Sequence, residues 1–164
     1  MRSAFGPRLS ARHMTPSQER SSRAALCLGV IIAIGLATSA SAQTPALLLF
    51  GGTNHKTFLG CLNCSKYDSA SVCNKYGDVG SRYSSDSIWN RYESFGSKYS
   101  SDSPWNRYSS SSPIIVDQSG RSYGYLSANR YHHNRTHIEV LVQLAEFVAE
   151  QDDLDKARDL FCGD

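Results

Sequence analysis

The hydrophobic positions fall into short clusters that predict different elements along the chain. Residues 46–50 are apolar and lie between Pro45 and a glycine pair, a pattern typical of a buried strand. Residues 114–116 and 122–126 are apolar or aromatic and flank the polar sequence 117–120, which predicts a β-hairpin with a four-residue turn. These segments are expected to form a small antiparallel sheet.

Two helices are predicted at the C-terminal end. The sequence THIE at residues 136–139 has the form of a capping box, and apolar residues recur every three or four positions after it. A helix is therefore expected from this box to about Glu150. Asp152 or Asp153 is expected to cap a second, shorter helix, whose apolar positions lie within residues 154–161.

The middle of the chain is a sixteen-residue repeat. Residues 81–92 read SRYSSDSIWNRY and residues 97–108 read SKYSSDSPWNRY, while residues 65–76 are an earlier, diverged copy, SKYDSASVCNKY. The three copies align over twelve columns without a gap. Each copy is therefore expected to form one structural unit that stacks on the next.

Within each unit we expect an extended segment followed by a single helical or 3₁₀ turn. Asp86 and Asp102 stand where a helix N-cap would be, and Pro104 falls in the first turn, where its missing N–H costs nothing. Gly80 and Gly96 end two of the copies and suit a left-handed exit from the turn.

The sequence as a whole predicts an α+β fold with a small antiparallel sheet, a stacked array of aromatic and serine-rich repeats, and a C-terminal helix. A repeat-containing domain is expected at residues 43–135, followed by a helical tail at residues 136–164. Within the domain, the expected segments are the repeats at about 65–80, 81–96 and 97–112 and the hairpin at about 113–128.

The aromatic residues of the repeat allow two interpretations. Cys73, Trp89 and Trp105 occupy one column, and these indoles can stack from copy to copy as the core of the array. Alternatively, Trp89 and Trp105, with Tyr83 and Tyr99, form an exposed ladder that binds glycan rings or a protein surface.

Residues 1–42 have the features of a secretory signal peptide. Two arginines precede an apolar run at residues 24–37, and an A-x-A cleavage site ends at Ala42. A membrane-spanning helix needs about 20 apolar residues, more than this run provides. The mature protein is therefore expected to begin at Gln43, to be secreted or periplasmic, and to have no membrane association after leader cleavage.

The net charge of the chain changes sign when the predicted leader is left out. The whole chain has 17 Lys and Arg against 15 Asp and Glu, a formal net charge of +2. The leader holds five Arg and one Glu, so the remaining 122 residues carry a net charge of −2. This balance argues against electrostatic binding of nucleic acid. A chain of this size predicts one small domain.

Four cysteines follow the leader, and they allow three kinds of chemistry. An even number in an oxidising compartment indicates two disulfides among Cys61, Cys64, Cys73 and Cys162, with three possible pairings. His55, Cys61, Cys64 and Cys73 are also a candidate tetrahedral zinc site, and zinc is the only cofactor that the sequence suggests. Cys61-x-x-Cys64 is a candidate thiol-redox motif, although it lies in a loop-like stretch.

A further histidine cluster, His132, His133 and His137, precedes the predicted helix and contains candidates for a general base. The sequence pairs it with no nucleophile, carboxylate pair or glycine-rich phosphate loop, so we assign no catalytic residue. We expect an exported, non-enzymatic structural or binding module whose ligand is a glycan or a protein surface. The alternative is a small zinc-binding or thiol-redox protein.

Several short motifs are similar to those of a known group of proteins. LLFGG at residues 48–52, FLGCLNC at residues 58–64, the Tyr-Ser-Ser-Asp-Ser-x-Trp-Asn repeats and PIIVD at residues 113–117 together resemble a group of small secreted bacterial proteins. The resemblance covers about residues 47–135 and leaves out the tail after Thr136. It implies an exported location and a repeat module, and it has no implication for chemistry.

Overall fold

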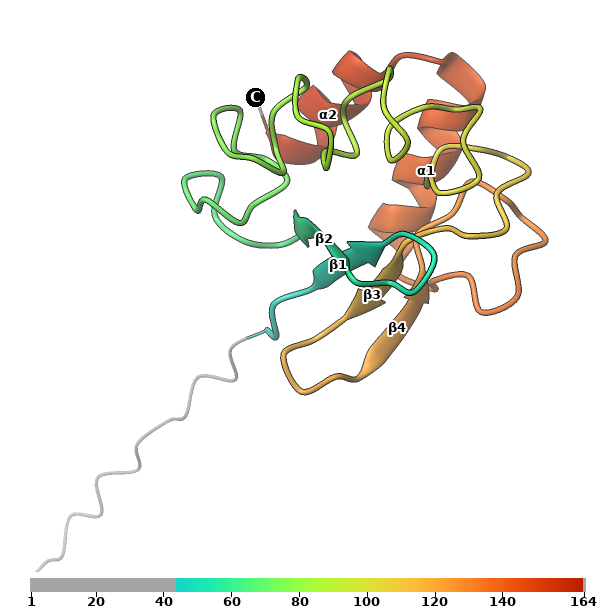
Figure 1. Ribbon diagram of the computed structural model, residues 1–164, viewed down its shortest axis with the longest axis horizontal. Coiled ribbons are helices and arrows are strands. Elements are labelled where there is room, and N and C mark those ends of the chain that lie inside the picture. Colours follow the sequence, from blue (N-terminus) through green and yellow to red (C-terminus); the bar gives the residue numbers. More distant parts are fainter. Residues whose placement is uncertain (1–43, 164) are drawn as a thin grey trace, which may run out of the picture. The chain divides into compact units, whose positions relative to one another are not determined.

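The computed structural model describes residues 44–163, so the predicted signal peptide lies outside the described residues. Along this part of the chain come two strands, a long segment of turns, two further strands and two helices (Figure 1). This arrangement confirms the predicted α+β fold.

A four-stranded antiparallel sheet has the strand order β2-β1-β3-β4. Its strands are β1 (Leu48–Gly51), β2 (Thr57–Cys61), β3 (Ile114–Val116) and β4 (Ser122–Tyr125). Leu49 and Ile115 face each other in the two central strands, and both are fully buried. Burial of these side chains on one face of the sheet explains why the two apolar runs form strands.

Strand β2 is absent from the sequence-based prediction, which treated the residues before Cys61 as loop-like. Leu48 of β1 pairs with Cys61, and Gly60, at φ +119°, interrupts the regular strand pattern. A Cβ at Gly60 would lie 2.7 Å from Cγ1 of Val72, so the glycine lets a neighbouring segment approach the strand. Pairing with β1, and not a local pattern, makes this segment a strand.

The predicted hairpin is confirmed. The N–H of Asp117 donates to the carbonyl of Arg121 at 3.0 Å, which closes the turn between β3 and β4. The carboxylate of Asp117 accepts hydrogen bonds from the Ser119 hydroxyl at 2.6 Å and the Arg121 N–H at 3.0 Å. These bonds lower the pKa of Asp117, because they favour its charged form, and the bond from the Ser119 hydroxyl has the largest effect.

Between β2 and β3 the chain forms consecutive β-turns. In the copy that starts at Ser81, four successive corner carbonyls each accept the N–H three residues along, at 3.1–3.4 Å. The step from one corner to the next is three residues in these four turns. The fifth step is four residues, because the N–H of Ser97 binds the carbonyl of Glu93 at 2.9 Å. Four steps of three residues and one step of four account for the sixteen-residue period.

The predicted helical turn capped by Asp86 and Asp102 is therefore wrong. The N–H of Asp86 donates to Oγ of Ser84 at 3.4 Å, and the N–H of Asp102 donates to Oγ of Ser100 at 3.2 Å. Each aspartate thus follows a turn corner by two residues and caps no helix. Serine and asparagine side chains at the corners bind nearby backbone N–H groups, which favours turns over helix.

The glycines at the ends of the copies have a different role from the one predicted. Gly80 and Gly96 do not adopt the left-handed conformation. A Cβ at Gly96 would lie 2.1 Å from the carbonyl oxygen of Asn90, and one at Gly80 would lie 2.2 Å from that of Asn74. The glycines are needed because the backbone of the preceding asparagine packs against them.

We expect Gly96→Ala to lower the free energy of unfolding by about 1–3 kcal/mol, because the added methyl group forces the backbone of the coil apart. Urea denaturation followed by tryptophan fluorescence measures this change. The matched control is Ser94→Ala, at an exposed position two residues away, for which a change within about 0.5 kcal/mol is expected. Equal urea midpoints for the two variants would contradict the packing role of Gly96.

Two helices complete the domain: α1 (Glu139–Gln151) and α2 (Leu154–Cys162). The predicted capping box does not form, because Ile138 is the N-cap of α1 and no side chain caps this end. Thr136 Oγ1 instead accepts the N–H of Ile138 at 3.3 Å. The predicted cap of the second helix is confirmed, since the Asp153 side chain accepts the N–H of Lys156 at 3.0 Å. Neither α1 nor α2, the two helices of the described residues, has the length and apolar composition of a membrane-spanning helix.

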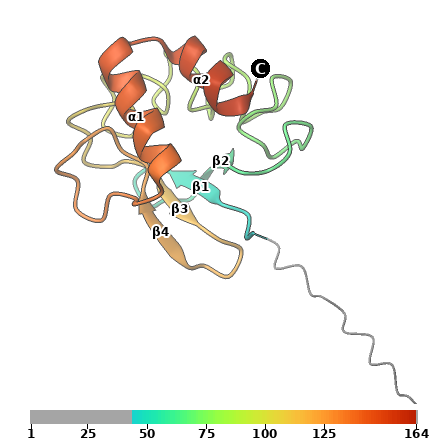
Figure 2. The same ribbon diagram turned by 180° about the vertical axis from the view of Figure 1, so that it is seen from behind.

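The helices pack against the turn segment, as the views from both sides show (Figures 1 and 2). Leu141, Leu144 and Val148 of α1 belong to the same buried cluster as Trp89 and Trp105. The tail and the repeats therefore share one hydrophobic core.

Candidate functional site

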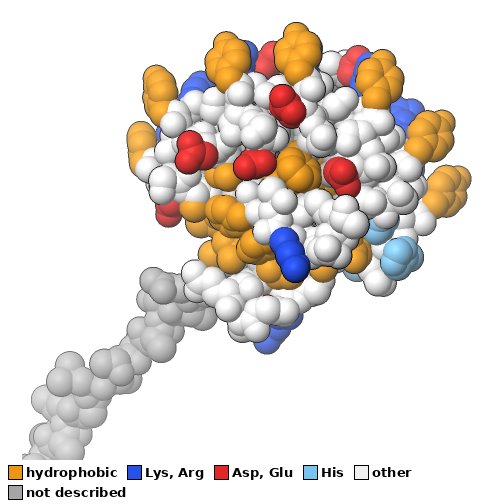
Figure 3. Space-filling view, viewed as in Figure 1, with side chains coloured by type: hydrophobic (Ala, Val, Ile, Leu, Met, Phe, Trp, Pro, Cys, Tyr) orange, Lys and Arg blue, Asp and Glu red, His pale blue; other side chains and the backbone are white. Residues whose placement is uncertain are grey.

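The most regular surface feature of the domain is a set of exposed tyrosines. Seven tyrosine side chains are 82–97% exposed, and hydrophobic side chains stand out one by one along the rim of the domain in Figure 3. Each of the seven follows a basic residue directly. The pairs are Lys66-Tyr67, Lys75-Tyr76, Arg82-Tyr83, Arg91-Tyr92, Lys98-Tyr99, Arg107-Tyr108 and Arg130-Tyr131.

The turn geometry places these tyrosines on the surface. Each lies two residues after a corner serine or asparagine, whose side-chain oxygen accepts the tyrosine N–H. Ser97 Oγ binds the N–H of Tyr99 at 3.4 Å, and Asn106 Oδ1 binds the N–H of Tyr108 at 2.8 Å. This local bond fixes the backbone beneath each ring without using the ring itself.

Asn129-Arg130-Tyr131 forms a further turn of the same type, beyond the hairpin. The Asn129 side chain accepts the N–H of Tyr131 at 3.0 Å and donates to the carbonyl of Ser109 at 3.0 Å. Ala128 precedes it and is buried, as Trp105 is before Asn106. This turn is absent from the sequence-based prediction, although it carries the same tripeptide, Asn-Lys/Arg-Tyr, that ends each copy.

Five of the seven basic residues beside the tyrosines bind residues of the two helices or of the link between them. Arg82 and Arg91 form ion pairs with Asp155 of α2 at 3.1 and 3.2 Å. Lys98 pairs with Asp152, and this hydrogen bond raises the pKa of Lys98. These pairs are half-exposed, and each adds little to stability. The ammonium group of Lys98 also lies over the ring of Tyr99, 5.3 Å from its centroid.

The same arrangement continues toward the last of these turns. The guanidinium of Arg107 donates to the carbonyl of Ala149, and Arg130 pairs with Glu150 at 3.1 Å and with Glu146 at 3.4 Å.

Three adjoining clefts lie between the turns and α1. The first, of about 440 Å³, is lined by Tyr92 and Tyr99; the second, of about 310 Å³, is lined by Tyr99 and Tyr108. The third, of about 450 Å³, is lined by Tyr108 and Tyr131. Residues 146–152 contribute to the helix side of all three, and Leu154 of α2 also lines the first. Because neighbouring clefts share a tyrosine, we call the three together the tyrosine groove.

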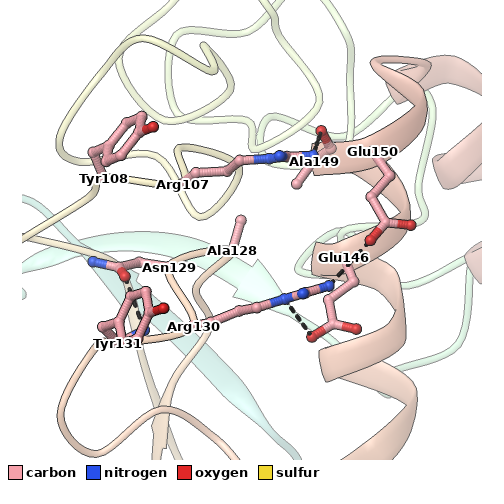
Figure 4. A pocket seen from close by; sticks show the side chains of 9 residues that line it. All are labelled: Arg107, Tyr108, Ala128, Asn129, Arg130, Tyr131, Glu146, Ala149 and Glu150. Carbon is pink, nitrogen blue, oxygen red and sulfur yellow. Dashed lines mark hydrogen bonds and ion pairs between the residues drawn. The ribbon is translucent and has the colours of Figure 1, made fainter.

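Figure 4 shows the third cleft from close by. Arg107 and Arg130 extend from their turns to α1, with Ala128 between them. Tyr108 and Tyr131 lie on the side of the cleft away from the helix. The cleft therefore combines two aromatic rings with two guanidinium groups that already bind residues of α1.

The two tryptophans lie in the core. Trp89 and Trp105 are 2% and 1% exposed, and their rings stack at a centroid distance of 5.6 Å. Each indole N–H donates to a carbonyl of the preceding copy, Trp89 to Val72 at 2.7 Å and Trp105 to Ile88 at 2.6 Å. Of the four aromatic residues singled out as a binding ladder, only Tyr83 and Tyr99 are therefore at the surface.

The cysteines form two disulfides, Cys61–Cys64 and Cys73–Cys162, which confirms the predicted disulfides and decides their pairing. In this state the sulfurs provide no thiolate for zinc or for thiol exchange. Within residues 44–163, no three His, Cys, Asp or Glu side chains are placed to hold a metal ion.

His55 lies beside Tyr125, with ring centroids 5.5 Å apart. His132 and His133 contact the same tyrosine at 4.7 and 6.1 Å and stack on each other at 5.0 Å. His137 lines a separate surface hollow next to Tyr125. The structure thus gathers His55, His132 and His133 around one aromatic ring.

Comparison with known proteins adds no assignment. The chain matches no family model, and neither a curated protein nor a solved structure is significantly similar to it.

Proposed function

We propose that this protein is an exported, non-enzymatic binding module and that the tyrosine groove is its contact surface. The observation that carries the proposal is that the tryptophans are buried whereas most tyrosines are exposed. In a small domain that buries both tryptophans, seven tyrosines are more than four-fifths exposed, six at regular positions of the repeat and Tyr131 in the related turn after the hairpin. Large aromatic side chains usually contribute to the core of a small domain, so their regular exposure supports a binding role.

The scaffold beneath the groove supports the same function. A disulfide joins the first copy to the end of α2, and tryptophan stacking joins the second copy to the third. A surface held in this way loses little conformational entropy on binding. The two disulfides support an exported location, because such bonds persist in oxidising compartments.

The test compares two double variants that differ only in where the tyrosines lie. Tyr99→Ser with Tyr108→Ser removes the two rings that adjoining clefts share, whereas Tyr67→Ser with Tyr76→Ser removes two exposed rings that line none of the three clefts. The probe is washed cell-envelope fragments of the producing organism, with which each protein is sedimented. Urea midpoints check that both variants stay folded.

We expect the wild type and the control to sediment with the fragments. The groove variant is expected to bind at least about tenfold more weakly. A wild-type protein that stays in the supernatant would contradict the proposal. Equal sedimentation of the two double variants would also contradict it.

A further inference from the structure

The tyrosine groove has the form of a site for an extended ligand. Tyr99 lines both the first and the second cleft, and Tyr108 lines both the second and the third. A chain of repeating units can therefore contact successive rings along α1, whereas a single small molecule would use one cleft and leave the others empty. Regularly spaced tyrosines in the protein therefore suit a ligand that is a chain of regularly spaced units.

The charges of the groove favour an uncharged ligand. Lys98 is paired with Asp152, Arg91 with Asp155, and Arg130 with Glu150 and Glu146. Arg107 is bound to a backbone carbonyl of α1. An anionic polymer would have to compete with these acidic groups, and those acids would repel it.

The side chains of the groove also match the surface of a sugar ring. One face of a pyranose presents C–H groups with a slight positive charge, which pack favourably on the negative face of a tyrosine ring. Its hydroxyl groups need hydrogen-bond partners at the edges. The half-exposed carboxylates of Asp152 and Glu150 and the arginine N–H groups line the helix side of the same clefts and can supply them.

From these observations, and on the basis of the proposed function, we infer that the ligand of the tyrosine groove is an uncharged polysaccharide. Successive sugar units of this polysaccharide lie against Tyr92, Tyr99, Tyr108 and Tyr131. Binding then depends on the length of the saccharide, since each additional unit reaches another ring.

Affinity electrophoresis in native gels tests the inference with defined probes. The gels contain dextran, galactomannan or hydroxyethylcellulose as uncharged polysaccharides and alginate as an anionic one. At least one uncharged polysaccharide is expected to slow the mature protein, and alginate is not. The Tyr99→Ser/Tyr108→Ser variant should bind at least about tenfold more weakly than the wild type. The affinity of the Tyr67→Ser/Tyr76→Ser control should stay within about twofold of wild type.

A second measurement uses oligosaccharides cut from the polysaccharide that slows the protein. In calorimetric titration, a tetrasaccharide is expected to bind at least about tenfold more tightly than a disaccharide, because it reaches more rings. Equal affinities would overturn the extended mode of binding.

Three gel outcomes would overturn the inference: no uncharged polysaccharide slows the protein, both double variants are slowed equally, or only alginate acts and its effect disappears with salt. If the gels are negative while envelope fragments still sediment the protein through Tyr99 and Tyr108, the ligand is of another class and the proposed function stands. If both experiments are negative, the proposed function fails as well.

Discussion

Trp105→Ala is expected to lower the free energy of unfolding by about 3–5 kcal/mol, the cost of deleting a large buried aromatic side chain. Trp105 is 1% exposed, stacks on Trp89 and donates its indole N–H to the carbonyl of Ile88. The substitution therefore leaves a cavity between two copies and also removes the hydrogen bond that joins them.

Urea denaturation followed by circular dichroism measures this effect without relying on the fluorescence of the deleted residue. Tyr83→Ala is the matched control, since this aromatic residue of the repeat is 85% exposed and its loss is expected to change stability by at most about 0.5 kcal/mol. Trp105→Phe separates the cost of the cavity from the cost of the lost hydrogen bond. It keeps a ring in the core and leaves the Ile88 carbonyl unpaired, which costs about 1–3 kcal/mol. Equal midpoints for Trp105→Ala and Tyr83→Ala would refute the core role of the indole.

Removal of the Cys73–Cys162 disulfide has the second large effect that we expect. This bond joins residues 89 positions apart, whereas Cys61–Cys64 joins residues three positions apart. In the chain-entropy model, the long loop gives a stabilisation of about 4–5 kcal/mol and the short loop about 2 kcal/mol. The double variant Cys73→Ala/Cys162→Ala should therefore lose more than twice as much stability as Cys61→Ala/Cys64→Ala.

The long disulfide also has a local consequence. The buried guanidinium of Arg158 in α2 donates to the carbonyl of Cys73 at 3.1 Å and to that of Gly80 at 3.4 Å. Without the disulfide, we expect the amides of α2 to exchange with solvent faster than those of α1, because α2 loses its covalent attachment to the first copy. Equal stability losses in the two double variants, with no faster exchange in α2, would contradict this role.

The sequence predicted the elements that depend on local patterns. The hairpin follows from apolar segments around a polar turn, and the Asp153 cap from an acidic residue before an amphipathic segment. The capping box at residues 136–139 failed because Thr136 binds the N–H of Ile138 and the helix begins only at Glu139. A capping motif shows which bonds are possible, and tertiary packing selects among them.

The candidate site was predicted only in part. The repeat identified Tyr83 and Tyr99 as aromatic positions but did not separate them from Trp89 and Trp105. Tyrosine and tryptophan occur at equivalent spacings after serine or asparagine, and the side of the coil on which each position falls depends on the turn geometry. Four steps of three residues and one of four set that geometry, and the serine-rich sequence was compatible with a helical turn as well.

Local patterns in the sequence were enough to predict the sixteen-residue period, the antiparallel hairpin and the amphipathic tail, because these features depend on residues close together in the chain. The folded structure was needed to show that strand β2 pairs with β1, that Cys73 pairs with Cys162, and that the Asn129 turn lies beside the third copy. It also placed the acidic helices against the basic side chains of the repeats, which leaves the tyrosines outside. These outcomes join residues far apart in the chain, so their free energies depend on contacts that no local pattern encodes.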